Sequence, residues 1–357
     1  MRRRGFIKAI ASSSVAWPLA VLGQQPAKLP TVGFFCQSTR SAASEWVAAF
    51  VQRLRELGWI EGRNVAIEYR WAEGHDERFA DLAAEFVRLK VDVIVASGTP
   101  AVLASKQATS VIPIIFATAG DPVRNNLVAS LAQPGGNVTG LSLQMGDLAG
   151  KRLELLREVV PGLRRLAIMA NVGNPATVLE LGELQAAAGT LGLELVTLEI
   201  RHAQDIVPAF EALKGRSEAL YVCTDGLINT NRIRINILAV GARLPTMHGS
   251  RDYVEAGGLM SYGVNFPNMF RRAAEYVDKI LRGTRFGSRQ VDNEIELGRL
   301  FDGDVARLRP TQNLVDIVGG APKLIREVCS EGHQPSRLHI SPWTRASSVV
   351  ARRPPGC

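Results

Sequence analysis

The sequence predicts an α/β protein with two doubly wound parallel-sheet lobes and a ligand cleft between them. Along most of the chain, short apolar segments alternate with amphipathic segments of helical period, as in the βαβ units of parallel sheets. The same order starts again after residue 142, which indicates a second unit of similar size. With 357 residues, 46% of them hydrophobic, the chain can bury two substantial cores.

The first half is expected to alternate strictly between strands and helices. Its strands are short apolar or alternating segments, and its helices carry apolar residues three and four positions apart. The expected strands are 32–36, 64–70, 91–96 and 114–117, and the expected helices are 44–57, 76–89 and 100–108. Right-handed crossovers would place these strands in one parallel sheet.

The stretch 113–142 links the two halves. Its first strand ends in Gly120-Asp121-Pro122, at the carboxyl edge where open α/β sheets bind ligands. A turn at 134–136 then leads to residues 137–142, which we expect to form the first hinge strand between the lobes.

The second half repeats the pattern of the first. Its expected helices are 147–160, 175–191, 203–213, 229–242 and 266–281, and its expected strands are 165–170, 194–200, 219–223, 245–248 and 259–262. We therefore expect lobe one at residues 24–138, lobe two at 139–262, and a helix returning toward lobe one at 263–287. Residues 288–357 form an atypical tail, which ends in a polar stretch rich in Arg, Ser and Pro and is expected to be partly disordered.

Residues 1–23 are expected to be an export signal. A basic segment precedes an apolar run at 9–22, and Val21 and Gly23 suit the positions before a cleavage site. Arg3 and Arg4, followed by Gly-Phe-Ile-Lys, resemble a twin-arginine signal, with an ordinary secretion signal as the alternative. We expect a protein that is exported to the periplasm and is soluble after cleavage.

The charge distribution excludes a nucleic-acid partner. The formal net charge is +8, but Arg2, Arg3, Arg4 and Lys8 lie in the expected signal and no basic stripe follows.

Cofactor and metal motifs are also missing from the sequence. The first strand lacks the Gly-x-Gly-x-x-Gly turn of dinucleotide-binding enzymes, and no Walker motif occurs. His75, His202 and His248 lack the spacing of a metal site. We expect neither a cofactor nor a metal. The cysteines at 36, 223, 329 and 357 identify no disulfide pair.

Several segments resemble the substrate-binding proteins of ABC transporters in the tryptophan/tyrosine-type periplasmic binding family. They are LPTVGFFCQSTR, LRELGWIEGRNVAIEYRWAEG, VDVIVASGTPAVLASKQATSVIPIIFATAGDPV, LAQPGGNVTGLS, KRLELLREVVPGL and GGLMSYG, in this order. The resemblance runs from about Arg3 to about Gly287 and implies a type I periplasmic binding fold that closes on a small solute. Members of the family usually end in a strand-rich segment that completes the hinge. We find no counterpart after Gly287 and hypothesise a rearrangement or frame shift there, which the nucleotide sequence would reveal.

Polar residues after the strands of lobe one are candidate ligand contacts. Hydroxyl groups and the amides at helix N-termini can bind a carboxylate or another anionic group of a ligand. Asp121 can bind an ammonium or hydroxyl group of a ligand. Helix caps and, for Asp121, a turn before Pro122 are equally good explanations. The candidates are Gln37, Ser38, Ser97, Thr99, Thr118 and Asp121.

Lobe two offers a second set of candidates, with helix caps and turns again as the alternative. In the fold that the resemblance implies, these residues would contact the ligand as the second lobe closes. They are Asn171, Asn174, Thr224, Asp225 and Tyr262. For Tyr262 the alternative is that its ring packs inside the lobe, which is more common for an aromatic side chain at a strand end than stacking on a ligand.

The resemblance implies the solute-binding component of an ABC importer that takes an amino-acid-like molecule, without catalysis. Its partners would be that small molecule and a membrane ABC permease, and we expect a monomer. The alternative is a secreted α/β enzyme that acts on a small carboxylate through Asp121 and the hydroxyl-rich loops.

Overall fold

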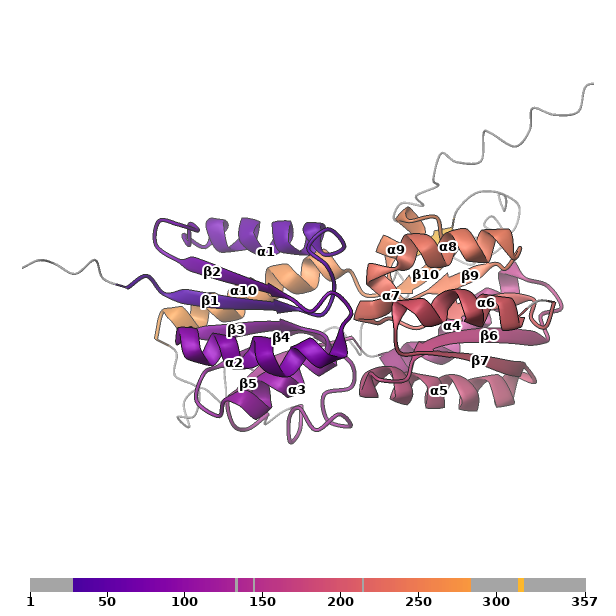
Figure 1. Cartoon of the computed structure of the whole chain (residues 1–357), viewed down its shortest axis with the longest axis horizontal. Coiled ribbons are helices and arrows are strands. Elements are labelled where there is room, and N and C mark those ends of the chain that lie inside the picture. The colour runs from indigo at the N-terminus through magenta and orange to yellow at the C-terminus, as the bar shows by residue number, and fades with distance from the viewer. Residues whose placement is uncertain (1–27, 132–133, 144, 214, 284–313, 318–357) are drawn as a thin grey trace, which may run out of the picture.

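The computed structural model describes residues 28–131, 134–143, 145–213, 215–283 and 314–317. These residues form two α/β lobes that lie side by side along the long axis of the molecule (Figure 1). Each lobe is a largely parallel sheet flanked by helices, which confirms the fold class predicted from the sequence. The expected export signal lies outside the described residues.

Lobe one is built on a five-stranded parallel sheet in the order β2-β1-β3-β4-β5. The strands are β1 (Thr31–Cys36), β2 (Ala66–Trp71), β3 (Val93–Ser97), β4 (Ile114–Ala119) and β5 (Val138–Ser142). β1, β3 and β4 are buried along their whole length because helices cover both faces of the sheet. α1 (Ser44–Glu56) and α10 (Phe266–Leu281) pack on one face, and α2 (Phe79–Leu89) and α3 (Thr99–Ala108) pack on the other.

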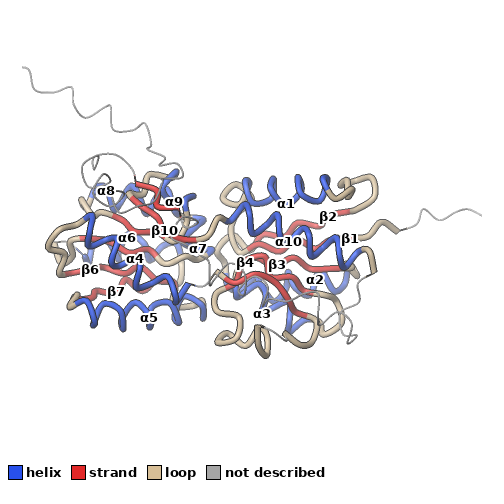
Figure 2. Tube along the Cα trace, turned by 180° about the vertical axis from the view of Figure 1, so that it is seen from behind, coloured by secondary structure: helices blue, strands red, loops and turns tan. Residues whose placement is uncertain are grey.

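Helix α10 lies in lobe one although it follows lobe two in the sequence. Trp46 of α1 stacks on Phe266 and Phe270 of α10, with ring centroids 4.8 and 5.6 Å apart. Arg53 of α1 pairs with Glu275 of α10 at 2.8 Å. Figure 2 shows α10 beside the strands of lobe one, so the chain crosses between the lobes at least twice.

Lobe two contains a six-stranded sheet in the order β11-β10-β9-β8-β6-β7. All neighbouring strands are parallel except β11, which runs antiparallel to β10. The strands are β6 (Arg165–Asn171), β7 (Glu194–Ile200), β8 (Ala219–Val222), β9 (Thr246–His248), β10 (Met260–Gly263) and β11 (Leu314–Ile317). The helices of lobe two are α4 (Met145–Val159), α5 (Pro175–Leu191), α6 (Ile206–Leu213), α7 (Gly226–Thr230), α8 (Arg232–Gly241) and α9 (Arg251–Glu255). Short 3-10 helices lie at Asp76–Arg78 in lobe one and at Ala203–Asp205 in lobe two.

Strand β5, the segment predicted to be the first hinge strand, belongs to the sheet of lobe one. It pairs in parallel with β4, with Val138 opposite Ile114, and forms the edge of that sheet. The predicted boundary between residues 138 and 139 therefore divides a strand. Met145 still packs in the core of lobe one, whereas Leu153 packs in lobe two. The first crossing thus lies at the start of α4.

The second half differs from the prediction at two further points. The helix expected at 229–242 is divided into α7 and α8 at Asn231, and the short helix α9 was not predicted. Of the atypical tail only 314–317 are described, as β11, and the expected disorder lies outside the described residues. Within the described ranges, no helix combines the length and apolar character needed to cross a bilayer.

Candidate functional site

The two lobes touch where the carboxyl ends of their strands face each other. Asn229 of α7 donates from Nδ2 to Ser38 Oγ after β1, at 3.2 Å, and both side chains are buried. The side chain of Gln37 packs against glycines of both lobes. A Cβ on Gly98 would lie 2.2 Å from the Gln37 amide group, and a Cβ on Gly226 would lie 2.5 Å from Gln37 Cγ. The structure therefore shows the lobes in a closed arrangement.

Two other glycines mark close approach between the lobes. A Cβ on Gly120, after β4, would lie 2.6 Å from Cβ of Ala176 in α5. A Cβ on Gly173, after β6, would lie 2.6 Å from Oδ2 of Asp76 in lobe one. A larger residue at either position would require the neighbouring atoms to shift, because protein interiors are closely packed.

The predicted hydroxyls of lobe one come together and bond to one another's loops. Ser97 Oγ and Thr118 Oγ1 are 3.0 Å apart, and Thr99 Oγ1 accepts from the Gly120 amide at 3.0 Å. All three residues are buried. These bonds connect the loops after β3 and β4 into one surface.

Asp121 stabilises a turn, which is one of the two roles that the sequence allowed for it. Its Oδ1 accepts from the amides of Val123 and Arg124, both at 3.0 Å, as an aspartate in a tight turn does. This geometry gives no support to the alternative of an enzyme that uses Asp121.

In lobe two the predicted polar residues form one buried cluster around Asp225. Asn171 Nδ2 donates to Asp225 Oδ1 at 3.2 Å, and Asn174 Nδ2 donates to Oδ2 at 2.9 Å. Asp225 Oδ1 also accepts from the amides of Leu227 and Ile228 and so caps α7. The cap geometry positions all three polar side chains at the edge that faces lobe one.

Thr224 and Tyr262, the other two candidates, lie around a buried arginine. A Cβ on Gly249, after β9, would lie 2.2 Å from Thr224 Oγ1 and 3.1 Å from Arg152 Nη2. The carbonyl oxygen of Tyr262 accepts from Arg152 Nε at 2.7 Å. The ring of Tyr262 belongs to the core of lobe two, where the residue is 8% exposed.

Sequence reasoning missed the buried partners Arg152 of α4 and Glu180 of α5. Arg152 Nη1 donates to Glu180 Oε1 at 2.9 Å and contacts Tyr221 Oη at 2.8 Å. Burial raises the pKa of Glu180, and the charge of Arg152 opposes this increase. Charged residues on an amphipathic helix usually face solvent, so no signal in the sequence distinguished these two.

Sequence reasoning also missed Asp76, because an acidic residue at the start of a helix indicates only a favourable interaction with the helix dipole. Its carboxylate lies at the contact with lobe two, beside Gly173. Partial burial of the carboxyl, followed by the negative charges of Asp225 and Glu77, raises the pKa of Asp76 to about 6, and the positive charges of His202 and Arg201 oppose this increase. Two carboxylates from different lobes thus face each other when the lobes are closed.

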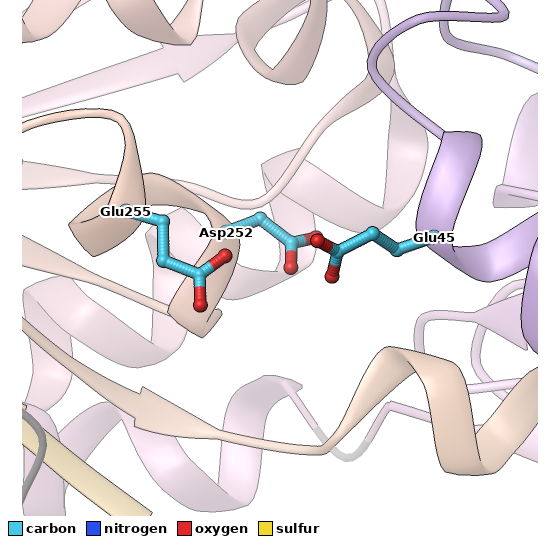
Figure 3. Close-up of side chains that lie close together, drawn as sticks. All are labelled: Glu45, Asp252 and Glu255. Carbon is cyan, nitrogen blue, oxygen red and sulfur yellow. The ribbon is translucent and has the colours of Figure 1, made fainter.

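A third group of acids lies at the rim of the contact. Figure 3 shows Glu45 of α1 pointing toward Asp252 and Glu255 of α9, and their oxygens lie within 4.8 Å of one another. They line a surface pocket of about 190 Å³ together with Arg232 and Trp46. Carboxylates suit hard cations, but Glu45 and Glu255 are exposed and Arg232 adds a positive charge to the pocket. This cluster by itself does not define a metal site.

Two doubly wound lobes that meet at the carboxyl ends of their strands have the architecture of type I periplasmic binding proteins. Residues 39–298 match the family model described as ABC transporter substrate binding protein. The chain belongs to this family, whose members bind small-molecule ligands outside the cytoplasm, act with ABC permeases and are binding proteins rather than enzymes.

Known relatives agree with this assignment. A tyrosine-binding protein of Clostridioides difficile is 28% identical over 265 residues, which cover 74% of this chain and 76% of the relative. A conserved domain protein of Vibrio cholerae has a similar structure, with 29% identity, a TM-score of 0.67 and coverage of 72% of this chain and 86% of its own. An L-tryptophan complex from Streptococcus pneumoniae has the same fold at 22% identity, with a TM-score of 0.66 and coverage of 71% and 85%.

Proposed function

We propose that this protein captures an amino acid, with aromatic amino acids first, between its lobes and delivers it to a membrane ABC permease. The hydrogen bond between Asn229 and Ser38 across the buried contact carries this proposal, because it joins helix α7 of lobe two to the loop after β1 in lobe one, where a solute would be enclosed. The tyrosine-binding relative supports the ligand class. We propose that the lobes close on the solute, as in other two-lobed binding proteins. The protein acts as a monomer and does not convert the solute chemically.

The proposed contacts of the solute are the strand-end residues of both lobes. Lobe one contributes Gln37, Ser38, Ser97, Thr99 and Thr118, and lobe two contributes Asn171, Asn174, Thr224 and Asp225. We propose no direct contact for Asp121, which forms its own turn, or for the core ring of Tyr262.

A thermal-shift screen of the purified chain against the twenty amino acids tests the function. A binder raises Tm in proportion to the logarithm of its concentration over Kd. We expect L-tyrosine or L-tryptophan to raise Tm and to be recovered unchanged by mass spectrometry. Absence of any shift, or conversion of the added amino acid, would contradict the proposal.

We further propose that residues 1–23 direct export to the periplasm by the twin-arginine route, as the basic segment and apolar run support. In a reporter fusion, the double change Arg3→Lys and Arg4→Lys should abolish export, whereas Arg2→Lys should leave it intact. Equal export by the double variant would point instead to an ordinary secretion signal.

A further inference from the structure

Arg152 lies where both described crossings enter lobe two. It is carried by α4, whose first residues form the first crossing, and its Nε donates to the Tyr262 carbonyl at 2.7 Å. Tyr262 is followed by Gly263, where the chain leaves lobe two for α10. The side chain of Arg152 therefore joins the two crossings directly.

The other end of the guanidinium is held by a buried acid and a buried phenol. Nη1 lies 2.9 Å from Glu180 Oε1 and 2.8 Å from Tyr221 Oη, and that hydroxyl is 2.8 Å from the same Glu180 oxygen. The side chains of Arg152 and Glu180 are 2% and 0% exposed. A buried charge held on several sides has one preferred position, since each displacement leaves a polar group without its partner.

The guanidinium also packs against the loops that face lobe one. A Cβ on Gly249 or Gly263 would lie 3.1 or 3.2 Å from Nη2, and a Cβ on Gly263 would lie 2.0 Å from the Gly249 carbonyl oxygen. Gly249 in turn packs against Thr224, a proposed ligand contact. Arg152 thus connects the two crossings, through Gly249, to the loops that follow β8 and β9 at the ligand-facing edge of the sheet.

We propose that Arg152 is a positioning residue for solute binding, which holds the two crossings and the Thr224 and Gly249 loops in the arrangement required for closure. It does not touch the solute. The proposal rests on the function proposed above, and it predicts that changes at Arg152 weaken ligand binding in a protein that remains folded.

The test compares Arg152→Lys with Arg157→Lys, since Arg157 is an exposed residue of the same helix. Lysine keeps the charge but cannot bond to Tyr262 and Glu180 as a planar fork. L-Tyrosine binding is measured by calorimetry and closure by small-angle X-ray scattering, at a temperature where circular dichroism shows native protein. We expect Arg152→Lys to raise Kd by about tenfold and to reduce ligand-induced compaction, within the usual range of coupling between sites, and Arg157→Lys to match wild type.

Equal Kd and equal compaction in Arg152→Lys, with only Tm lowered, would show a purely structural role and overturn the inference. If Arg152→Lys does not fold, Tyr221→Phe removes the hydroxyl that contacts both Arg152 and Glu180 while keeping the ring, and unchanged Kd there overturns the inference too. Wild type is titrated first with all twenty amino acids. If it binds none, the proposed function fails and this inference with it.

Discussion

The indole Nε1 of Trp46 in lobe one donates a 2.8 Å hydrogen bond to Asp252 Oδ2 in lobe two, across 206 positions of sequence. The ring of Trp46 is fixed in lobe one by stacking on Phe266 and Phe270. Asp252 is carried by the short helix α9 of lobe two. Because the two groups belong to different lobes, this bond exists only when the lobes are together.

Trp46→Phe should therefore weaken solute binding more than it weakens the fold. Phenylalanine preserves a stacked ring but removes the donor, and a hydrogen bond to a charged group contributes about 1.5–3 kcal/mol. We expect Kd for the bound amino acid to rise by about tenfold or more. Trp59→Phe is the matched control, since Trp59 Nε1 donates to Asp278 Oδ1 at 2.8 Å within lobe one. A similar change in Kd for both variants would contradict a specific role in closure.

Asp76 should make the stability of the closed protein depend on pH. The pKa of its carboxyl is raised from its ordinary value of 3.8 to about 6, so the folded protein binds the proton more tightly than the unfolded chain does. The contribution of this group to stability is then fully present below pH 3.8 and is lost as pH rises through about 6. Asp76→Asn removes this loss.

The measurement is Tm of wild type and Asp76→Asn in steps between pH 4 and about 7, since their difference isolates one titrating group. The variant should gain over wild type as pH rises and then keep a constant advantage. Asp81→Asn, a change at an exposed residue of α2, should follow wild type. A difference that does not change with pH would show that the charge of Asp76 is not destabilising.

Gly120→Ala should oppose closure. The new methyl group would lie 2.6 Å from Cβ of Ala176 in the other lobe, so the lobes must separate slightly or shift. Overpacking of this kind costs about 1–3 kcal/mol, which corresponds to a Kd raised by about 5- to 150-fold. Ligand-free Tm should change little.

Gly182→Ala serves as the control for Gly120→Ala, because its Cβ meets no atom within 4 Å in the middle of α5. That change should preserve Kd and raise Tm, since alanine favours a helix over glycine. Calorimetry and thermal unfolding of both variants provide the comparison, and unchanged affinity in Gly120→Ala would show that the bound protein does not use this contact.

Asp225→Ala should destabilise lobe two. The carboxylate accepts from two amides of α7 and from Asn171 and Asn174, all buried in part or whole, and its removal leaves these donors without an acceptor. We expect a loss of about 3 kcal/mol in unfolding free energy by urea denaturation. Asp205→Ala removes a comparable but exposed cap at the amides of Arg201 and His202 and should cost about 1 kcal/mol. Equal losses would mean that burial adds nothing to the role of Asp225.

Much of the fold was predictable because secondary structure follows local periodicity. The last helix was expected at 266–281, and α10 occupies Phe266–Leu281. The division of the predicted helix 229–242 was not predictable from its apolar pattern, because the break lies in the non-helical backbone of Asn231, whose side chain donates to the Leu227 carbonyl. The sheet to which residues 139–142 belong was not predictable either, since a strand before a crossing can pair with either sheet and only the bonds to β4 decide.

The sequence by itself determined the alternation of strands and helices, the division into two lobes and the polar residues at the strand ends, including Ser38 and Asp225. These features depend on residues a few positions apart, which interact whatever the rest of the chain does. Only the tertiary structure decided that Arg152 is buried with Glu180 and that Trp46 meets Asp252. Such partners lie on different elements, and their approach depends on the path of the whole chain rather than on any local pattern.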